Sequence, residues 1–207
     1  MGLRRPAVTV PVHTSNALGA ARYKSKLLAP APCAAPQKID TTTTKPMHIP
    51  IQSEPIQSPL ECWVDVAPSK GLIAVVFGKQ YQLFRLKPDW QAAGLDHNWA
   101  ETVALELLTR ALVAHGYTGP SIRVRSDSTI ALRVLNGGKC SVKEIEECGA
   151  RLRYVMDVLP FKVEGLKVGG KQNVADGISR GRKVKGYVEV KCPVNIPEAL
   201  SPYVSPE

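Results

Sequence analysis

The spacing of apolar residues changes partway along the chain, and this change restricts the possible folds more than any other feature. Apolar side chains alternate with others over residues 62–67, and two further apolar runs cover 71–77 and 80–86, joined by Gly78-Lys79. A period of two predicts strands, and the short connection predicts a hairpin. We therefore predict that the first part of the fold is a three-stranded meander.

A helical period replaces this alternation after the meander. A helix predicted over 99–115 has one apolar stripe and ends at Gly116, whereas Glu106 lies off the stripe and is predicted to face solvent. Ser141 and Glu144 have the spacing of a capping box. The remaining predicted elements are a strand at 121–126, helices at 128–135 and 141–159, a strand at 161–168 and a short helix at 173–180. This order predicts an α/β fold in which a mixed five-stranded sheet is flanked by helices.

The two ends of the chain differ in composition from this region. Residues 1–58 contain many prolines and no acid before Asp40, which predicts a disordered Pro-rich basic tail. A mitochondrial transit peptide is the alternative that this basic start allows. We expect one domain over 59–181 and a C-terminal tail over 182–207. No run of 18 apolar residues occurs, so we expect neither a membrane span nor a membrane partner.

Charge and cysteine content narrow the range of partners. The 27 Lys and Arg residues exceed the 18 Asp and Glu residues and give a net charge of +9. This excess favours a polyanion such as nucleic acid, although a solvated basic surface explains it equally well. The five cysteines form no Cys-x-x-Cys pair, so we expect no zinc site. An odd count without a secretory segment predicts reduced thiols in an intracellular protein of the nucleus or cytoplasm.

One acidic residue occupies a position that its predicted strand does not favour. Asp65 lies between Val64 and Val66, and aspartate is depleted in strands because it packs poorly there. The ordinary alternative is the exposed face of an edge strand. Trp63 and Ala67 share the face of Asp65, which argues against that alternative. We therefore favour a functional role for this carboxylate.

Three further acids have ordinary explanations when each is considered alone. Glu101 falls on the apolar stripe of its helix, yet Asn98 could be an N-cap with Glu101 as the other half of a capping box. Asp127 ends a strand and begins a helix, as an N-cap does. Asp176 follows Asn173 by three residues, which is again a capping arrangement. The local patterns leave both explanations open.

The positions of the four acids along the predicted elements favour a common site. Pairing within the sheet would place the first and fourth strands side by side, and the helix starts would approach the same edge of the sheet. Carboxylates gathered in one place repel each other unless cations or protons neutralise them. Oxygen ligands of this kind suit Mg²⁺ or Mn²⁺. The sequence therefore predicts a divalent-metal site.

The segments that contain these acids resemble the four acidic motifs of the ribonuclease H family. These segments are Cys-Trp-Val-Asp at 62–65, Trp-Ala-Glu-Thr-Val-Ala-Leu-Glu at 99–106, Arg-Ser-Asp-Ser-Thr at 125–129 and Asn-Val-Ala-Asp-Gly-Ile-Ser-Arg at 173–180. The last segment resembles the end of retrotransposon ribonuclease H domains. The start of the second segment is most similar to such domains in tyrosine-recombinase retroelements. The resemblance covers about residues 60–181.

This resemblance implies a ribonuclease H-like fold and a metal-dependent endonuclease. The enzyme would hydrolyse the RNA strand of an RNA–DNA hybrid with two Mg²⁺ or Mn²⁺ ions. Asp65, Glu101, Asp127 and Asp176 would be the catalytic and metal-binding residues. The implied partners are the hybrid itself and a reverse transcriptase or a retroelement polyprotein.

Two departures from the family pattern affect how the hybrid would be bound. The single helix predicted over 141–159 leaves no room for an additional basic helix, and the loop over 168–172 lacks the histidine that assists product release in cellular members. We therefore expect slower turnover. The candidate nucleic-acid contacts are Ser69, Asn98, Ser128, Lys171 and Arg180. Trp90 and Trp99 are further candidates for stacking on a base, with core packing favoured for Trp99.

Three other interpretations remain at this point. A degenerate ribonuclease H-like module would bind nucleic acid without cutting it. A different nuclease or a transposase would use the same fold and acids on another substrate. A structural protein would use these acids only as helix caps.

Overall fold

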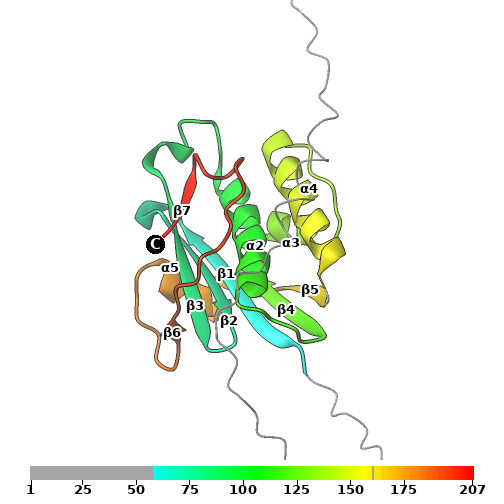
Figure 1. Cartoon of the computed structure of the whole chain (residues 1–207). Coiled ribbons are helices and arrows are strands. Elements are labelled where there is room, and N and C mark those ends of the chain that lie inside the picture. The colour runs from blue at the N-terminus through cyan, green and yellow to red at the C-terminus, as the bar shows by residue number, and fades with distance from the viewer. Residues whose placement is uncertain (1–57, 160) are drawn as a thin grey trace, which may run out of the picture. The chain divides into compact units, whose positions relative to one another are not determined.

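The predicted meander is present in the computed structural model, which describes residues 58–159 and 161–207 (Figure 1). Strands β1 (Leu60–Ala67), β2 (Leu72–Phe77) and β3 (Gln80–Leu86) pair antiparallel in chain order. Alternate side chains of these strands point to opposite faces of the sheet. One face therefore presents the apolar residues that form the main core, and the other presents Asp65.

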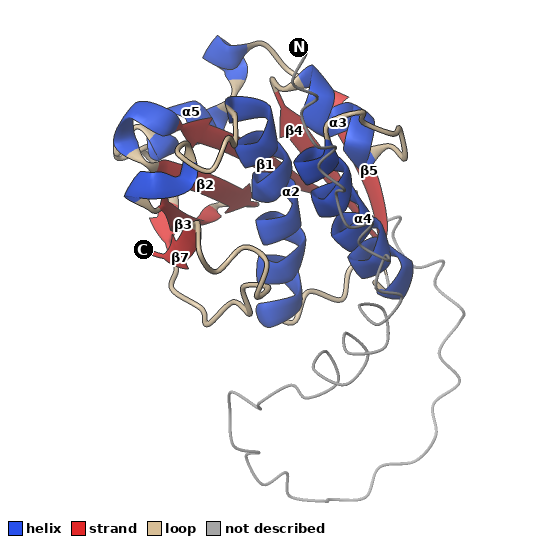
Figure 2. Ribbon diagram, turned by 90° about the horizontal axis from the view of Figure 1, so that it is seen from above, coloured by secondary structure: helices blue, strands red, loops and turns tan. Residues whose placement is uncertain are grey.

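Two parallel strands and the helices complete the predicted part of the fold. Strand β4 (Ser121–Ser126) pairs with β1, and β5 (Lys162–Lys167) pairs with β4. The helices are α2 (His97–Ala114), α3 (Thr129–Leu135), α4 (Lys143–Val158) and α5 (Val174–Ser179), with 3₁₀ turns η1 (Pro68–Lys70), η2 (Pro88–Trp90) and η3 (Gly170–Gln172). Helices α2, α3 and α4 cover one face of the sheet (Figure 2), and α5 packs on the other face against β1 and β2.

Helix α2 lies at the centre of the main core. Every residue from Trp99 to Leu112 is buried, although the sequence indicates only one apolar stripe. The reason is that α2 is enclosed by the sheet on one side and by α3 and α4 on the other. A helix covered on several sides buries polar residues as well, and these then require partners.

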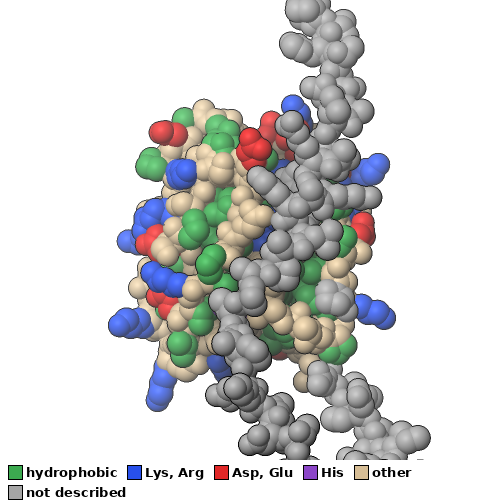
Figure 3. Space-filling view, viewed as in Figure 1, with side chains coloured by type: hydrophobic (Ala, Val, Ile, Leu, Met, Phe, Trp, Pro, Cys, Tyr) green, Lys and Arg blue, Asp and Glu red, His purple; other side chains and the backbone are tan. Residues whose placement is uncertain are grey.

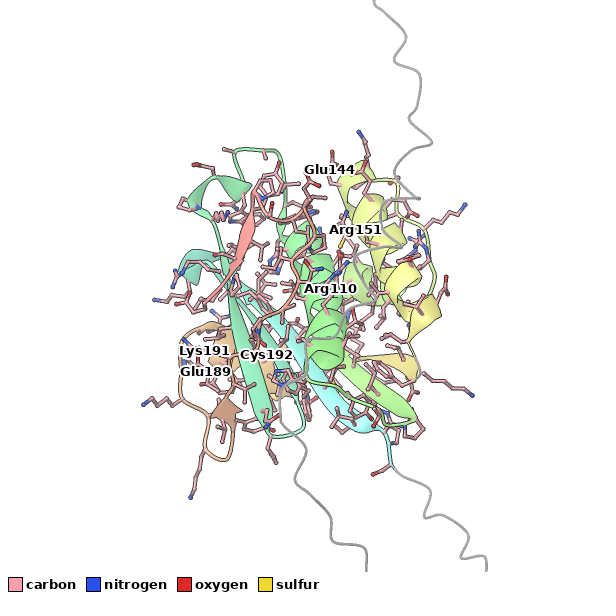
Figure 4. The ribbon with its side chains drawn as sticks, in the orientation of Figure 1. Arg110, Glu144, Arg151, Glu189, Lys191 and Cys192 are labelled. Carbon is pink, nitrogen blue, oxygen red and sulfur yellow. The ribbon has the colours of Figure 1, made fainter. Side chains whose placement is uncertain are left out.

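Glu106 is the clearest consequence of this enclosure, and its predicted exposure is wrong. Its side chain is fully buried because α4 covers that side of α2. Arg110 Nη2 lies 2.8 Å and Arg151 Nε 3.1 Å from carboxylate oxygens of Glu106. Figure 4 shows the labelled Arg110 and Arg151 between the two helices. Glu106 therefore joins α2 to α4 instead of facing water.

The predicted capping box at the start of α4 is also wrong. The helix begins at Lys143 with Val142 as its N-cap, and no side chain in the described part of the chain caps it. Glu146, not Glu144, supplies the carboxylate that reaches back, and it accepts a hydrogen bond of 2.8 Å from the amide of Cys140. The spacing of Ser141 and Glu144 is therefore not used.

The segment after Arg180 is part of the sheet and not the predicted tail. Strand β6 (Val188–Glu189) pairs parallel with β3, and β7 (Val204–Pro206) pairs antiparallel with β3. The described sheet therefore has seven strands instead of five, in the order β5-β4-β1-β2-β3-β6 with β7 also on β3. Val194, Leu200 and Val204 are buried in the main core. The folded part thus includes residues 182–207, whereas the tail predicted over 1–58 lies outside the described residues except for Ser58.

Because the last strand is packed into the core, we expect Val204→Ala to lower the free energy of unfolding by about 2 kcal/mol. Val204 is only 2% exposed, so the substitution leaves a cavity under β7. Denaturant unfolding of the full chain measures the change. Val188→Ala is the control, because Val188 in β6 is 62% exposed and its loss should have little effect. Equal losses from both substitutions would contradict the packing of β7.

None of the helices in the described part of the chain is long and apolar enough to cross a membrane.

Candidate metal centre

Asp65 is buried on β1 and is held there by two side chains of the last helical segment. Ser179 Oγ donates a hydrogen bond of 2.5 Å to Asp65 Oδ2, and Asn173 Nδ2 donates one of 3.2 Å to Oδ1. Asn173 Nδ2 also donates to the carbonyl of Val64 at 2.9 Å. Asp65 is 3% exposed, so the explanation as an exposed strand edge is wrong. Ser179 of α5 and Asn173, which precedes α5, therefore fix the orientation of the Asp65 carboxylate.

Glu101 is buried in the second turn of α2 and has no capping role. Asp96 is the N-cap of this helix, since its Oδ1 accepts a hydrogen bond of 2.8 Å from the amide of Trp99. The explanation that Asn98 and Glu101 form a capping box is therefore wrong. His97 Nε2 lies 3.4 Å from Glu101 Oε1. Glu101 Oε2 is buried and has no hydrogen-bond partner among the described residues.

Asp127 follows β4 directly and is exposed. Its neighbour Ser128 is the N-cap of α3, with Oγ accepting a hydrogen bond of 3.2 Å from the amide of Ala131. The N-cap explanation for Asp127 is therefore wrong, because Ser128 takes that role. A Cβ atom at Gly170 would lie 3.2 Å from Asp127 Oδ2, so the absence of a side chain lets η3 approach this carboxylate.

Three of the four predicted acids converge on one point. Asp65, Glu101 and Asp127 each offer a carboxylate oxygen, and these three oxygens lie within 4.8 Å of one another. They come together because β1 and β4 are parallel neighbours, while α2 packs against β1. The group has the ligand type and spacing to hold a metal ion.

Asp176 shares the cleft with these acids but does not belong to the group of three. Its Oδ1 accepts a hydrogen bond of 2.8 Å from Arg180 Nε, and it makes no capping contact, because the Asn173 side chain accepts from the amide of Ala175 instead. The cleft has a volume of about 310 Å³. It is lined by all four acids and by Ser69, His97 and Arg180.

The electrostatics of the cleft favour bound cations or protons. Burial, with the charges of Asp65 and Asp127 adding to it, raises the pKa of Glu101 to about 9. Burial also raises the pKa of Asp65 to about 6, and the charges of Asp127 and Asp176 act in the same direction. The hydrogen bond from Ser179 opposes this shift. A divalent cation at this position would relieve the same repulsion that protonation relieves.

The predicted nucleic-acid contacts lie in different places relative to the cleft. Ser69 and Arg180 line it, and Ser128 is adjacent to Asp127. Asn98 Nδ2 donates to Asp96 in the first turn of α2. Lys171 is exposed in η3. All five remain candidates for contacts with a ligand.

Stacking of the two tryptophans on a base is excluded by their burial. Trp90 and Trp99 are each 4% exposed, and their ring centroids lie 6.0 Å apart. Trp99 also makes an edge contact with Tyr203 of the C-terminal segment, which covers this part of the core. Core packing, already favoured for Trp99, therefore applies to both.

Three side chains that contact the predicted acids, Asn173, Ser179 and His97, were not predicted from the sequence as site residues. Asn173 and Ser179 lie within the closing motif, where Asn173 is interpreted only as a cap, and both bind Asp65. His97 lies one turn before Glu101, a spacing that places both on one side of a helix. The positions of these three residues were visible in the sequence, but position alone does not distinguish a site residue from any other polar residue.

Comparisons with protein-family models, curated proteins and solved structures found no match to this chain.

The raised pKa of Glu101 predicts how stability depends on pH when no divalent cation is bound. The unfolded chain loses this proton near pH 4.5, whereas the folded chain keeps it up to about pH 9. The folded state therefore binds more protons in this window, and its stability falls as the pH rises across it. We expect Glu101→Gln to remove part of this decline. Denaturant unfolding near pH 4.5 and near pH 9, with a chelator present, measures the free energy of unfolding of both proteins. The same decline in both proteins would contradict the shift.

Proposed function

We propose that this chain is a metal-dependent endonuclease that hydrolyses the RNA strand of RNA–DNA hybrids. The observation that carries the proposal is the convergence of Asp65, Glu101 and Asp127, with Asp176 on the wall of the same cleft. These four positions are the acids of the segments that resemble ribonuclease H motifs. The mixed sheet with helices on both faces is compatible with that resemblance.

The residues of the cleft fit a divalent metal. Their donors are carboxylate oxygens, which suit Mg²⁺ and Mn²⁺, and the buried Glu101 Oε2 lacks a hydrogen-bond partner among the described residues. Asp65, Glu101 and Asp127 would hold one ion, and Asp65 with Asp176 would hold a second. When bound, such ions lower the pKa of a water molecule and stabilise charge on a leaving oxygen.

The protein side chains around the acids hold them in place for this chemistry. Asn173 and Ser179 fix both oxygens of Asp65, so this carboxylate is preorganised before any ligand enters. Arg180 offsets the charge of Asp176 and lines the cleft, where a phosphate would meet its guanidinium. Selectivity for RNA would come from hydrogen bonds to 2′-hydroxyl groups, for which Ser69, Asn98 and Ser128 are the candidates.

The full chain with a labelled RNA–DNA hybrid provides the test. We expect cleavage of the RNA strand with Mg²⁺ or Mn²⁺ and none with a chelator. Single-stranded DNA, double-stranded DNA and double-stranded RNA are the comparison substrates. Preferred cleavage of one of these would replace the proposal with another nuclease activity. Hybrid binding that is unchanged by the chelator, without cleavage under any condition, would indicate a degenerate binding module.

A further inference from the structure

A group of unpaired cations follows the last helix directly. We define the basic loop as residues 181–187, which join α5 to β6. Arg182, Lys183 and Lys185 in this loop are exposed, and none of them forms an ion pair with any residue that the structure describes. With Arg180, residues 180–187 contain four cations and no acid. Like charges so close together cost free energy in the absence of an anion.

The backbone of the basic loop is held against α5. The amide of Gly181 donates to the carbonyl of Ile178 and that of Arg182 to Gly177, both at 2.9 Å. Val184 packs on a second apolar cluster, which lies between α5 and the sheet and is formed by Ala74, Val76, Ala175 and Ile178. A Cβ atom at Gly177 would lie 3.2 Å from Val184 Cγ2. The three cations are therefore presented from an anchored segment, which lowers the entropic cost of binding an anion.

The far end of the loop joins a further cation on the sheet. Tyr187 packs on the same apolar cluster, and Lys79 Nζ, from the turn between β2 and β3, lies 4.6 Å from the centre of its ring. The amide of Val188 donates to the carbonyl of Lys79 at 2.9 Å. Glu189, the next acid in the chain, is already paired with Lys191 at 3.7 Å. Figure 3 shows Lys and Arg side chains projecting along the edge of the molecule where β6 lies.

The near end of the loop begins at the cleft. Arg180, which lines the cleft and pairs with Asp176, immediately precedes Gly181. Cations therefore continue from the wall of the cleft along α5 to the turn at Lys79. A polyanion that occupies the cleft and extends past Arg180 toward the basic loop would meet these cations.

We propose that the basic loop binds the phosphate backbone of the nucleic acid whose scissile bond lies in the cleft. The inference rests on the proposed function, because it assumes that nucleic acid occupies the cleft. Arg182, Lys183 and Lys185 would each contact a phosphate, with Lys79 at the far end. Contacts of this kind position a nucleic acid without reading its sequence. The loop would thereby supply the basic surface for which this fold, with the single helix α4, has no additional basic helix.

The test measures binding of a fluorescent RNA–DNA hybrid to the full chain over a range of salt concentrations, with a chelator present so that the hybrid stays intact. The triple variant Arg182→Ala, Lys183→Ala, Lys185→Ala should lower the slope of log affinity against log salt by about 2 to 3. Its affinity at low salt should be roughly ten-fold weaker than that of the unmodified chain. The control is Lys139→Ala, Lys143→Ala, Lys162→Ala, which removes three exposed cations located elsewhere.

The expected result is a loss of affinity and slope in the loop variant that clearly exceeds the loss in the control. Equal losses in both would show that net charge alone sets the affinity, and would overturn the proposal. Unchanged binding by the loop variant, or no hybrid binding by the unmodified chain, would overturn it as well. Thermal melting of both variants confirms that they are folded. Because binding is measured without divalent cations, this test can fail while hybrid cleavage is observed, and it can succeed where cleavage is absent.

Discussion

Asp127→Asn is expected to lower the rate of hybrid cleavage by about a thousand-fold or more, as loss of one member of an interdependent catalytic group does. The substitution removes one of the three carboxylates that lie within 4.8 Å of one another. Asp127 is exposed and makes no cap, so the fold should be preserved. Cleavage of labelled hybrid under single-turnover conditions measures the rate. Full activity in this variant would refute the metal-site assignment.

The same substitution has a second expected effect that does not depend on activity. Without divalent cations, the charge of Asp127 raises the pKa of Asp65 and Glu101, so its removal should increase the melting temperature. Added Mg²⁺ or Mn²⁺ should stabilise the unmodified protein through binding to the folded state, and should stabilise the variant much less. Asp157→Asn, an exposed acid near the end of α4, is the matched control and should show neither effect.

The order of the strands and helices could be predicted because their apolar periods are long and regular. The meander, the two parallel strands and the four helices follow from those periods and from the glycines between them. The convergence of Asp65, Glu101 and Asp127 could be predicted as well, because parallel neighbouring strands end at the same edge of a sheet. The divalent metal follows from the gathered carboxylates, whereas the substrate and the reaction rest on the resemblance of the four motif segments to ribonuclease H.

The parts that could not be predicted depend on tertiary contacts. Strands β6 and β7 are two and three residues long, too short to show a period, and prolines lie between them and within β7. They form because β3 offers an unpaired edge and because Leu200 and Val204 can enter the core. The caps of α2, α3 and α4 were misassigned for a related reason, since Ser, Thr, Asp and Asn are frequent near helix starts and spacing does not select among them. Asn173, in contrast, is the N-cap of α5 as interpreted.

Glu106 illustrates the same limit and has the larger energetic consequence. The helical period places it off the apolar stripe of α2, and only the position of α4 explains its burial. Arg110, with a side chain 6% exposed, and Arg151, 15% exposed, both bind its carboxylate. Cys148 Sγ of α4 lies 3.4 Å from Oε2. One buried anion is thus shared by two cations that come from two helices.

Glu106→Ala should therefore lower the free energy of unfolding by about 3–5 kcal/mol, because it removes the buried carboxylate to which both Arg110 and Arg151 bind. Urea unfolding followed by circular dichroism measures the loss. Glu106→Gln should cost less, since its amide oxygen still accepts a hydrogen bond. Glu147→Ala is the control: that residue is 58% exposed and lies 3.8 Å from Lys143, so its loss should cost about 1 kcal/mol or less. If Glu106→Ala cost as little as this control, the ion pairs of Glu106 would not be what holds α4 to α2. Apolar contacts of buried residues such as Leu152 would then have to account for that packing.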